Sequence, residues 1–270
     1  MEFLPLLVLM LVIGAFAGIA AGLLGVGGGI ILVPAFYYTF TSLGYDSPQI
    51  MQICVATSLA TIIFTSVRSV LGHHKKGAVD WQILRGWAPG IALGAILGVL
   101  IASGLKSNTL MMVFGVLGLF IGSYMAFGKS EWRLGDDMPT GIRRLVFGPI
   151  IGFLSVLMGI GGGSFGVPIM TLYDRSIHRA VATAAGFGVL IAVPAVIGFL
   201  LAGWGLANKP PFTLGLVNIP AFAVVVAMTT LTAPLGVRLA HAMDPKPLKR
   251  VFAVFIAVMA ANMLRTALLG

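Results

Sequence analysis

The sequence has little charge and almost no cysteine, and both shortages narrow the class of protein. Only 9% of its 270 residues are charged, whereas a soluble globular domain carries about 25%. The hydrophobic fraction is 59% and the mean hydropathy is +1.04. The single cysteine, Cys54, excludes an intrachain disulfide and is expected to be a small packing residue. This composition indicates an integral membrane protein.

Acidic residues are missing from every long apolar run. The chain has 8 Asp and Glu against 17 Lys and Arg, a formal net charge of +9. The basic residues lie in short segments between apolar runs, so the positive-inside rule explains them better than a nucleic-acid partner does. Without a buried carboxylate, the spans can offer neither an acidic cation site nor a carboxylate proton relay. They also lack a cluster of nucleophile, base and metal ligands, so we expect no enzyme activity, no cofactor and no metal site.

Two glycine-rich segments organise the chain. AGLLGVGGGIILVP at residues 21–34 aligns without a gap with SVLMGIGGGSFGVP at 155–168, and seven of the 14 positions are identical. Three consecutive glycines are poor helix material, because each costs about 1 kcal/mol relative to alanine. Paired helix breaks at corresponding positions of two halves indicate the binding site of a secondary transporter. The alternative is close helix packing, and we favour function because the triple glycine is duplicated.

The first apolar run, residues 3–40, is too long for one crossing. As a straight helix it would measure ~57 Å, against a hydrocarbon core of about 30 Å. It therefore predicts a helical hairpin that bends at residues 25–29, and 145–173 repeats this pattern around the second glycine segment. A full crossing by the short arm remains the alternative. A loop is expected at 72–85, and further spans are expected at 49–71, 86–104, 108–127, 181–201, 214–240 and 248–268.

The sequence is a tandem duplication, and we predict that its halves are inverted. Val-Ala-Thr at 55–57 returns at 181–183 after the second glycine segment. We place the first repeat at 1–128, a connector at 129–144 and the second repeat at 145–270. A hairpin followed by three spans crosses the membrane an odd number of times, so the second repeat starts from the opposite side. The predicted fold is thus an all-α membrane protein with two inverted-topology repeats, each a glycine-broken hairpin followed by three spans.

Basic residues decide between inverted and parallel halves. Apart from Arg68 and Arg238, which lie within spans, 12 basic residues lie on the connector side in the inverted scheme and three on the other, whereas parallel halves divide these 15 nine to six. The positive-inside rule therefore predicts a cytoplasmic connector with both termini outside. The connector side holds Lys75, Lys76, Arg85, Lys129, Arg133, Arg143, Arg144, Arg175, Arg179, Lys246, Lys249 and Arg250, and the other side holds Lys106, Lys209 and Arg265.

The glycine breaks are the expected substrate site. The residues after each break begin a half-helix whose free N–H groups carry partial positive charge, which favours an anion. Ser164 is the polar side chain that directly follows the second triple glycine, and Ile30 is its counterpart. Threonine and serine hydroxyls early in the next span could donate to the anion, or could bond their own helix one turn back. The expected binding residues are Gly27, Gly28, Gly29, Ile30, Thr57, Ser58, Gly161, Gly162, Gly163, Ser164 and Thr183.

Three further polar residues are candidates for gating or coupling. Gln52 and His178 occupy aligned positions near the loop ends, where a plain interfacial role is the alternative. Arg68 could pair with a substrate, or could snorkel from near the end of its span. The tract HHKK at residues 73–76 is interpreted as a solvated loop, because no third metal ligand lies nearby in the sequence.

The motifs together resemble the sulfite exporter TauE/SafE family. They are GLLGVGGGIILVP, LMGIGGGSFGVP, the Val-Ala-Thr that follows each, and the closing APLGVRLAHAMDPKPLKRVFAVFIAVMAANML. The resemblance implies a multi-pass transporter of the bacterial plasma (inner) membrane for a small sulfur-containing anion such as sulfite, sulfoacetate or another organosulfonate. Composition and spacing do not themselves indicate sulfur.

The sequence thus predicts a secondary transporter, an exporter by resemblance, with alternating access about the two breaks. Its partners would be the anion, the lipid bilayer and, as a further option, a second copy of the chain. An anion channel could use the same half-helix dipoles in a continuous pore. A transporter of a small organic anion without sulfur is the other alternative.

Overall fold

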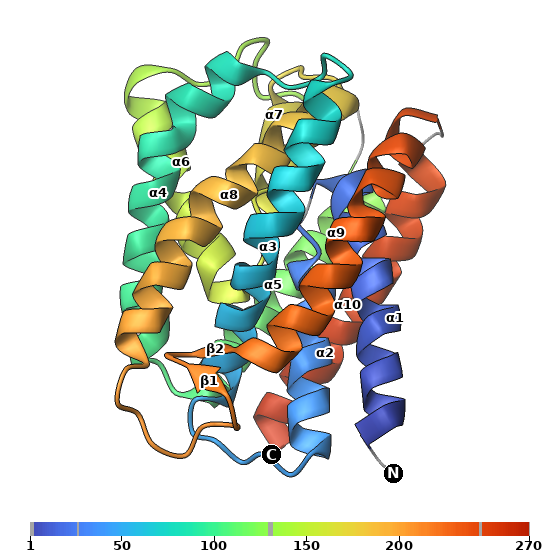
Figure 1. Cartoon of the computed structure of the whole chain (residues 1–270). Helices are drawn as coiled ribbons and strands as arrows, with labels where there is room; N and C mark the ends of the chain where they lie inside the picture. Colours follow the sequence, from blue (N-terminus) through green and yellow to red (C-terminus); the bar gives the residue numbers. More distant parts are fainter. Residues whose placement is uncertain (1–2, 26, 129–131, 243–244, 270) are drawn as a thin grey trace.

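The computed structural model describes residues 3–25, 27–128, 132–242 and 245–269, and these residues fold into helices joined by short loops (Figure 1). Two short antiparallel strands, β1 (Thr213–Leu214) and β2 (Val217–Asn218), precede α9. The helices of the described residues are α1 (Phe3–Leu24), α2 (Gly29–Ser42), α3 (Ile50–His74), α4 (Trp81–Gly104), α5 (Ser107–Phe127), α6 (Gly141–Met158), α7 (Gly163–Leu172), α8 (Ile177–Ala202), α9 (Ile219–Ala242) and α10 (Pro245–Leu269).

Seven of the described helices are long and apolar enough to cross a membrane, namely α1, α3, α4, α5, α6, α8 and α9. Shorter apolar helices are α2, α7 and the 253–269 part of α10. Each of the six spans expected after the hairpins is a helix, within a few residues of its expected bounds except at the starts of α4 and α9, which are each five residues away. The prediction of a membrane protein made of helices is therefore confirmed.

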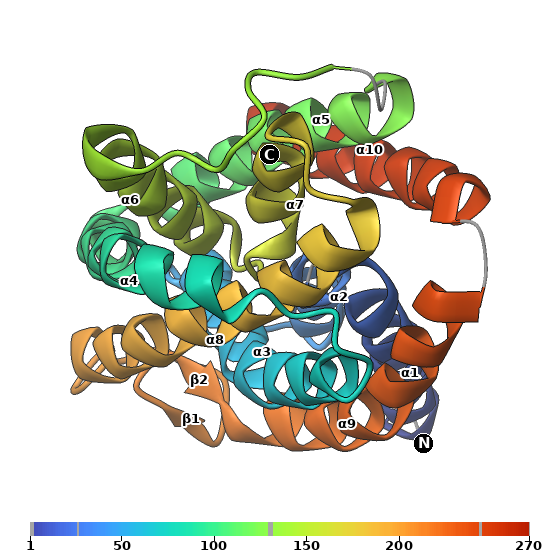
Figure 2. The ribbon, with the colours of Figure 1, turned by 90° about the horizontal axis from the view of Figure 1, so that it is seen from above.

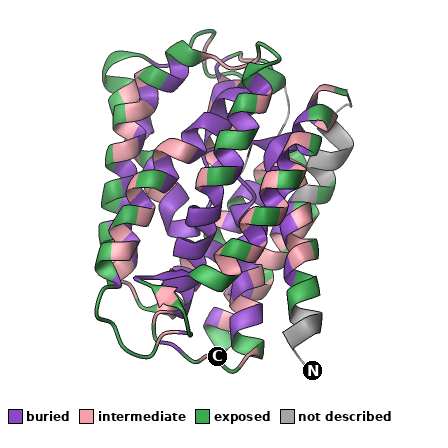
Figure 3. Cartoon of the chain, viewed as in Figure 1, coloured by how far each residue is buried: buried purple, intermediate pink, exposed green. Residues whose placement is uncertain are grey.

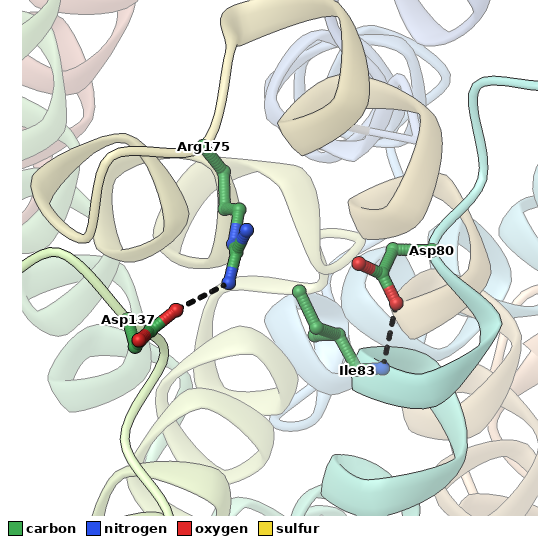
Figure 4. A network of polar contacts seen from close by, with 4 residues as sticks. All are labelled: Asp80, Ile83, Asp137 and Arg175. Carbon is green, nitrogen blue, oxygen red and sulfur yellow. Dashed lines mark hydrogen bonds and ion pairs between the residues drawn. The ribbon is translucent and has the colours of Figure 1, made fainter.

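Two expected boundaries were wrong. The loop predicted at 72–85 is shorter, because α3 continues to His74 and Asp80 caps the start of α4. The Asp80 carboxylate accepts hydrogen bonds from the backbone N–H groups of Gln82 at 3.1 Å and of Ile83 at 3.0 Å, the second of which is drawn in Figure 4. The span predicted from residue 214 begins only at Ile219, because the β1–β2 turn occupies the residues before it.

The two broken segments enter from opposite ends of the molecule. In Figure 1, α1 starts at the lower end beside the N-terminus and α2 returns to that end. α6 starts at the upper end, and α7 returns to the upper end. The C-terminus lies at the lower end with the N-terminus, and the segment between α5 and α6 lies at the upper end.

Glycines let two helix pairs pack at short range. α1 packs on α9 and α4 packs on α6. A Cβ atom on Gly22 of α1 would lie 2.1 Å from the carbonyl oxygen of Ala233, and one on Gly94 of α4 would lie 2.0 Å from that of Pro149. Both glycines belong to runs spaced by four, 14-18-22 and 90-94-98. This is the small-residue packing used between membrane helices, where backbones approach without an intervening side chain.

The core of the molecule lies around α3, which is buried along most of its length (Figures 2 and 3). α8 packs on α3 and α4, and α9 packs on α3. The outer helices instead present large apolar side chains to the surroundings, as lipid contact requires. Examples more than half exposed are Val12, Leu100, Phe120, Leu201, Leu231 and Val258.

The connector is tied to the turn between α7 and α8. Arg133 pairs with Asp174 at 2.9 Å, and Arg175 pairs with Asp137 at 3.2 Å (Figure 4). These pairs are largely exposed, so each contributes little stability but helps to fix the position of the connector. Residues 129–131 of the predicted connector lie outside the described residues.

Candidate functional site

Each hairpin turns at glycine. The first break is defined as residues 25–29 and the second as 159–163, and residue 26 lies outside the described residues. α1 ends at Leu24 and Gly25 has a φ of +67°, while α6 ends at Met158 and Gly159 has a φ of +64°. Both glycines thus occupy the left-handed position that ends many helices and that other residues adopt only with strain.

The two breaks lie against each other in the interior. A Cβ atom on Gly29 would stand 2.2 Å from the carbonyl oxygen of Gly159 and 2.8 Å from the Cα of Ile160. A Cβ atom on Gly27 would stand 3.2 Å from the Cα of Gly161. All five residues are buried. The structure therefore brings together predicted site glycines that are far apart in sequence, in direct backbone contact.

Each break also contacts the Val-Ala-Thr span of the other half. A Cβ atom on Gly25 would lie 2.6 Å from the carbonyl oxygen of Val181 on α8. One on Gly159 would lie 3.0 Å from the Cα of Val55 on α3. Val55 and Val181 are the first residues of the duplicated Val-Ala-Thr, so the two contacts are equivalent when the halves are exchanged.

The remaining glycines of the breaks do not share one conformation. Gly27 and Gly28 have φ values of +76° and +78°, whereas Gly162, the counterpart of Gly28, has a φ of −65°. Gly162 lies against α8, where a Cβ atom would stand 2.2 Å from the Cβ of Phe187. The two breaks are thus alike in position but different in backbone conformation.

The duplicated threonines bond to helix starts in the opposite half. The Thr183 hydroxyl oxygen accepts a hydrogen bond from the backbone N–H of Asp80 at 2.9 Å, and Thr57 accepts one from the backbone N–H of Asn218 at 3.0 Å. Asp80 caps α4, and the Asn218 side-chain oxygen accepts from the N–H of Ala221 in the first turn of α9. Neither acceptor bond is the own-helix bond considered from the sequence. Both threonines are fully buried.

The two serines of the predicted site differ in how they are bonded. Ser58 donates to the carbonyl oxygen of Gly159 at 2.8 Å and so fastens α3 to the second break. Ser164, in the first turn of α7, is only 4% exposed, and its hydroxyl has no hydrogen-bond partner. A buried polar atom without a partner costs free energy. Ile30, the counterpart of Ser164, is buried and apolar.

Ser164 lines a cavity of about 60 Å³ next to the second break. The first N–H groups of a helix have no partner within the helix, and the start of α7 at Gly163 faces the same cavity. Tyr124 of α5 and Thr171 of α7 add polar groups to a wall that is otherwise mostly apolar. Such a site can accept a small anion through a hydroxyl, N–H groups and the helix dipole, without a buried cation.

Of the gating candidates, Gln52 joins α3 to the α4–α5 link. Its amide nitrogen donates to the carbonyl oxygen of Leu105, and its amide oxygen lies 2.9 Å from the hydroxyl of Ser107. Arg68 is exposed on α3 and lies six residues before His74, so it is farther from the helix end than the sequence suggested.

His178 belongs to a cluster with His73 and His241 that sequence reasoning missed. Its ring stacks on that of His241 at a centroid distance of 5.9 Å. His73, interpreted from the sequence as a loop residue, is instead part of α3 and 1% exposed, and it bonds both His241 and the backbone of Gly22. The spacing of buried α3 residues at 62, 66, 69 and 73 follows one helix face and could have placed His73 there.

Acidic side chains are absent from the helices over the residues that the structure describes. Asp46, Asp80, Asp136, Asp137 and Asp174 all lie in loops or at a cap. Over the same residues, no group of three or more His, Cys, Asp or Glu side chains could hold a metal ion.

The many apolar helices and the broken pair that meets in the interior define a multi-pass membrane protein of the transporter class. The family model described as "Sulfite exporter TauE/SafE" matches residues 10–263. The chain belongs to this family of membrane transporters and is not an enzyme.

Similar proteins cover nearly the whole chain. A probable membrane transporter protein of Haemophilus influenzae is 32% identical over 257 residues, which are 95% of this chain and 97% of that protein. One of Methanocaldococcus jannaschii is 28% identical over 270 residues, 97% of each chain. The probable membrane transporter YunE of Bacillus subtilis is 30% identical over 218 residues, 73% of this chain and 79% of that protein.

Proposed function

We propose that the protein is a secondary transporter that moves a small sulfur-containing anion by alternating access about the two breaks. The observation that carries this proposal is Ser164, a buried hydroxyl without a partner in the first turn of α7, beside a cavity that Gly163 of the second break also lines. Sulfur enters through the family, whose printed description is sulfite exporter. Sulfite, sulfoacetate and other organosulfonates are the substrates to test.

The proposal includes an inverted repeat, with units at 1–128 and 145–270. Two pairs of interactions support it, because each pair is preserved when the halves are exchanged. The first pair is Gly25 against Val181 and Gly159 against Val55. The second pair consists of the two hydrogen bonds that helix-capping residues donate from their backbone N–H groups to the duplicated threonines. The opposite entry of α1 and α6 in Figure 1 agrees with this symmetry.

We further propose that the end with the connector faces the cytoplasm of a bacterial plasma membrane. In the inverted scheme the sequence assigns 12 basic residues to the connector side against three to the other, and the positive-inside rule relates this bias to the cytoplasm. Both termini would then be outside. An anion that leaves the cytoplasm would enter from the connector end, where the Ser164 cavity lies between α5, α7 and α8.

The test is uptake into liposomes that contain the purified protein. Sulfite, sulfoacetate, taurine and sulfate are offered, and saturable uptake of a sulfonate or sulfite is expected. In Ser164→Ala, uptake at low substrate should fall about ten- to hundredfold, because a hydrogen bond to a charged group is worth about 1.5–3 kcal/mol.

Ser69→Ala is the matched control. Ser69 is also buried and its hydroxyl also has no partner, but it lies outside the cavity, so uptake should not change. Equal uptake by both variants would show that the substrate does not bind at Ser164 of α7. Observation of single-channel currents would show that the protein is an anion channel and not a carrier. Uptake of only those anions that lack sulfur would overturn the proposed substrate class.

A further inference from the structure

Three histidines from three helices gather at the connector end. His73 belongs to α3, His178 to the first turn of α8 and His241 to the last turn of α9. The His73 Nδ1 and His241 Nε2 atoms are 3.1 Å apart, and the rings of His178 and His241 stack. His73 is buried, whereas His178 is exposed and His241 is half-buried. The cluster thus leads from the surface to the interior.

The bonding partners determine where the protons lie. The Nε2 atom of His73 is 3.0 Å from the carbonyl oxygen of Gly22, which can only accept, so Nε2 carries a hydrogen. In a neutral His73, Nδ1 is then an acceptor, and the Nε2–H group of His241 donates to it. Bonds therefore run in one direction, from His241 through His73 to the last turn of α1.

This arrangement can hold one additional proton. A proton added to Nδ1 of His241 leaves its Nε2–H bond to His73 intact and puts the positive charge on the more exposed ring. A second proton would have to enter His73 at Nδ1. Two N–H groups and two positive charges would then face each other at 3.1 Å, beside a ring that is 1% exposed.

Few other charged groups of the described residues act on the pair. Lys76, which follows α3, and His178 of α8 interact electrostatically with His241, and His178 also acts on His73. α1 contributes only the Gly22 carbonyl oxygen. His74, the neighbour of His73, turns elsewhere and accepts a hydrogen bond from the Trp81 indole at 3.2 Å.

The histidine cluster and the Ser164 cavity share a wall. His73, His178 and His241 line a narrow pocket of about 10 Å³ together with Leu23, Ile177 and Val181. Those three apolar residues also line the Ser164 cavity. Val181 in addition contacts Gly25 of the first break. A charge gained by the histidines is therefore one layer of side chains from the proposed anion.

We infer that the His73–His241 pair is a proton-binding site coupled to anion binding, so that one proton moves with each anion in the same direction. The inference rests on the proposed function. A positive charge behind the shared wall favours an anion in the cavity, and by linkage the anion favours the proton equally. The pair also supplies a proton-binding site in spans that lack carboxylates.

Two measurements test the inference. In proteoliposomes with a pH dye inside, an inward gradient of sulfoacetate should acidify the lumen, and a lower outside pH should increase uptake. In His73→Gln and His241→Gln, which keep hydrogen-bonding groups but cannot titrate, proton movement should fall to the level of protein-free liposomes. Exchange of labelled for unlabelled sulfoacetate at equal pH should persist, because exchange needs no net proton movement.

The second measurement needs no transport. The chain has four histidines, so 15N spectra of histidine-labelled protein in nanodiscs can follow each ring with pH. Replacing His241 should change the titration of His73, and the matched control His74→Gln should change neither that titration nor transport. Independent titration of His73 and His241, or proton movement that survives in both variants, would overturn the inference. If the protein without substitutions does not exchange sulfoacetate, this result would instead count against the proposed function. The spectra would still decide whether the pair binds a proton.

Discussion

Gly29 lies so close to Gly159 that a Cβ atom on Gly29 would stand 2.2 Å from the Gly159 carbonyl oxygen. The two residues belong to different breaks, so this contact fastens one half of the chain to the other. Gly29 is the first residue of α2 and does not have a positive φ. Glycine is therefore needed there because a side chain would not fit, and not because of the backbone conformation. Because backbone meets backbone, no side chain can rotate away to make room.

Gly29→Ala should therefore destabilise the protein by more than about 3 kcal/mol, the usual upper end for overpacking. The measurement is the yield of monodisperse protein and its melting temperature in detergent. Gly104→Ala is the control, because no heavy atom lies within 4 Å of a Cβ there, and it should fold normally. A stable Gly29→Ala protein would show that the breaks can separate at little cost.

Thr57→Val and Thr183→Val should each lower stability by about 1–3 kcal/mol, because each leaves a backbone N–H without its acceptor, that of buried Asn218 or of half-buried Asp80. One bond is at the start of α4, at the upper end of Figure 1, and the other is at β2, at the lower end, so the losses should add in the double variant. Thermal unfolding in detergent provides the measurement. Thr41→Val, which removes an exposed hydroxyl bonded to its own helix, should have little effect. Unchanged stability together with weaker substrate binding would point to the direct substrate role that the sequence suggested.

Asp80→Ala should cost about 1 kcal/mol, because α4 loses its N-terminal cap. Asp80→Asn should cost no more than a few tenths, since Asn is as good a cap as Asp. The same role is filled in the other half by Asn218. The melting temperatures of the two variants in detergent measure these stability losses. An equal loss in both would mean that the charge of Asp80, rather than its capping oxygen, is needed.

Labelling with a membrane-impermeant maleimide should show which end faces the cytoplasm. The native Cys54 is buried, so new cysteines can be read against a low background. Ala207→Cys, exposed in the loop after α8, should be labelled in intact cells. Asp136→Cys, exposed in the connector, should be labelled only after the cells are opened. The reverse pattern would overturn the orientation proposed from the basic residues.

Much of the helical framework could be predicted from the sequence, because transfer of a segment into a bilayer depends on its own length and composition. Uncharged runs located the spans, and the duplicated glycines located the breaks, within a few residues. The errors occurred where polar residues continue or delay a helix. α3 extends to His74, and α9 starts only after the β1–β2 turn.

What only the tertiary structure decided is which residues meet. The sequence paired Thr57 with Thr183, but it did not show that each bonds to a helix start in the other half, nor that His73 reaches His241. In a soluble protein the apolar face of a helix marks its buried side. In a membrane, lipid-facing and buried side chains are both apolar, so sequence periodicity says little about which face is inside. Sequence alone therefore determined where the chain crosses, breaks and repeats, and three-dimensional packing decided which of its few polar groups lie together.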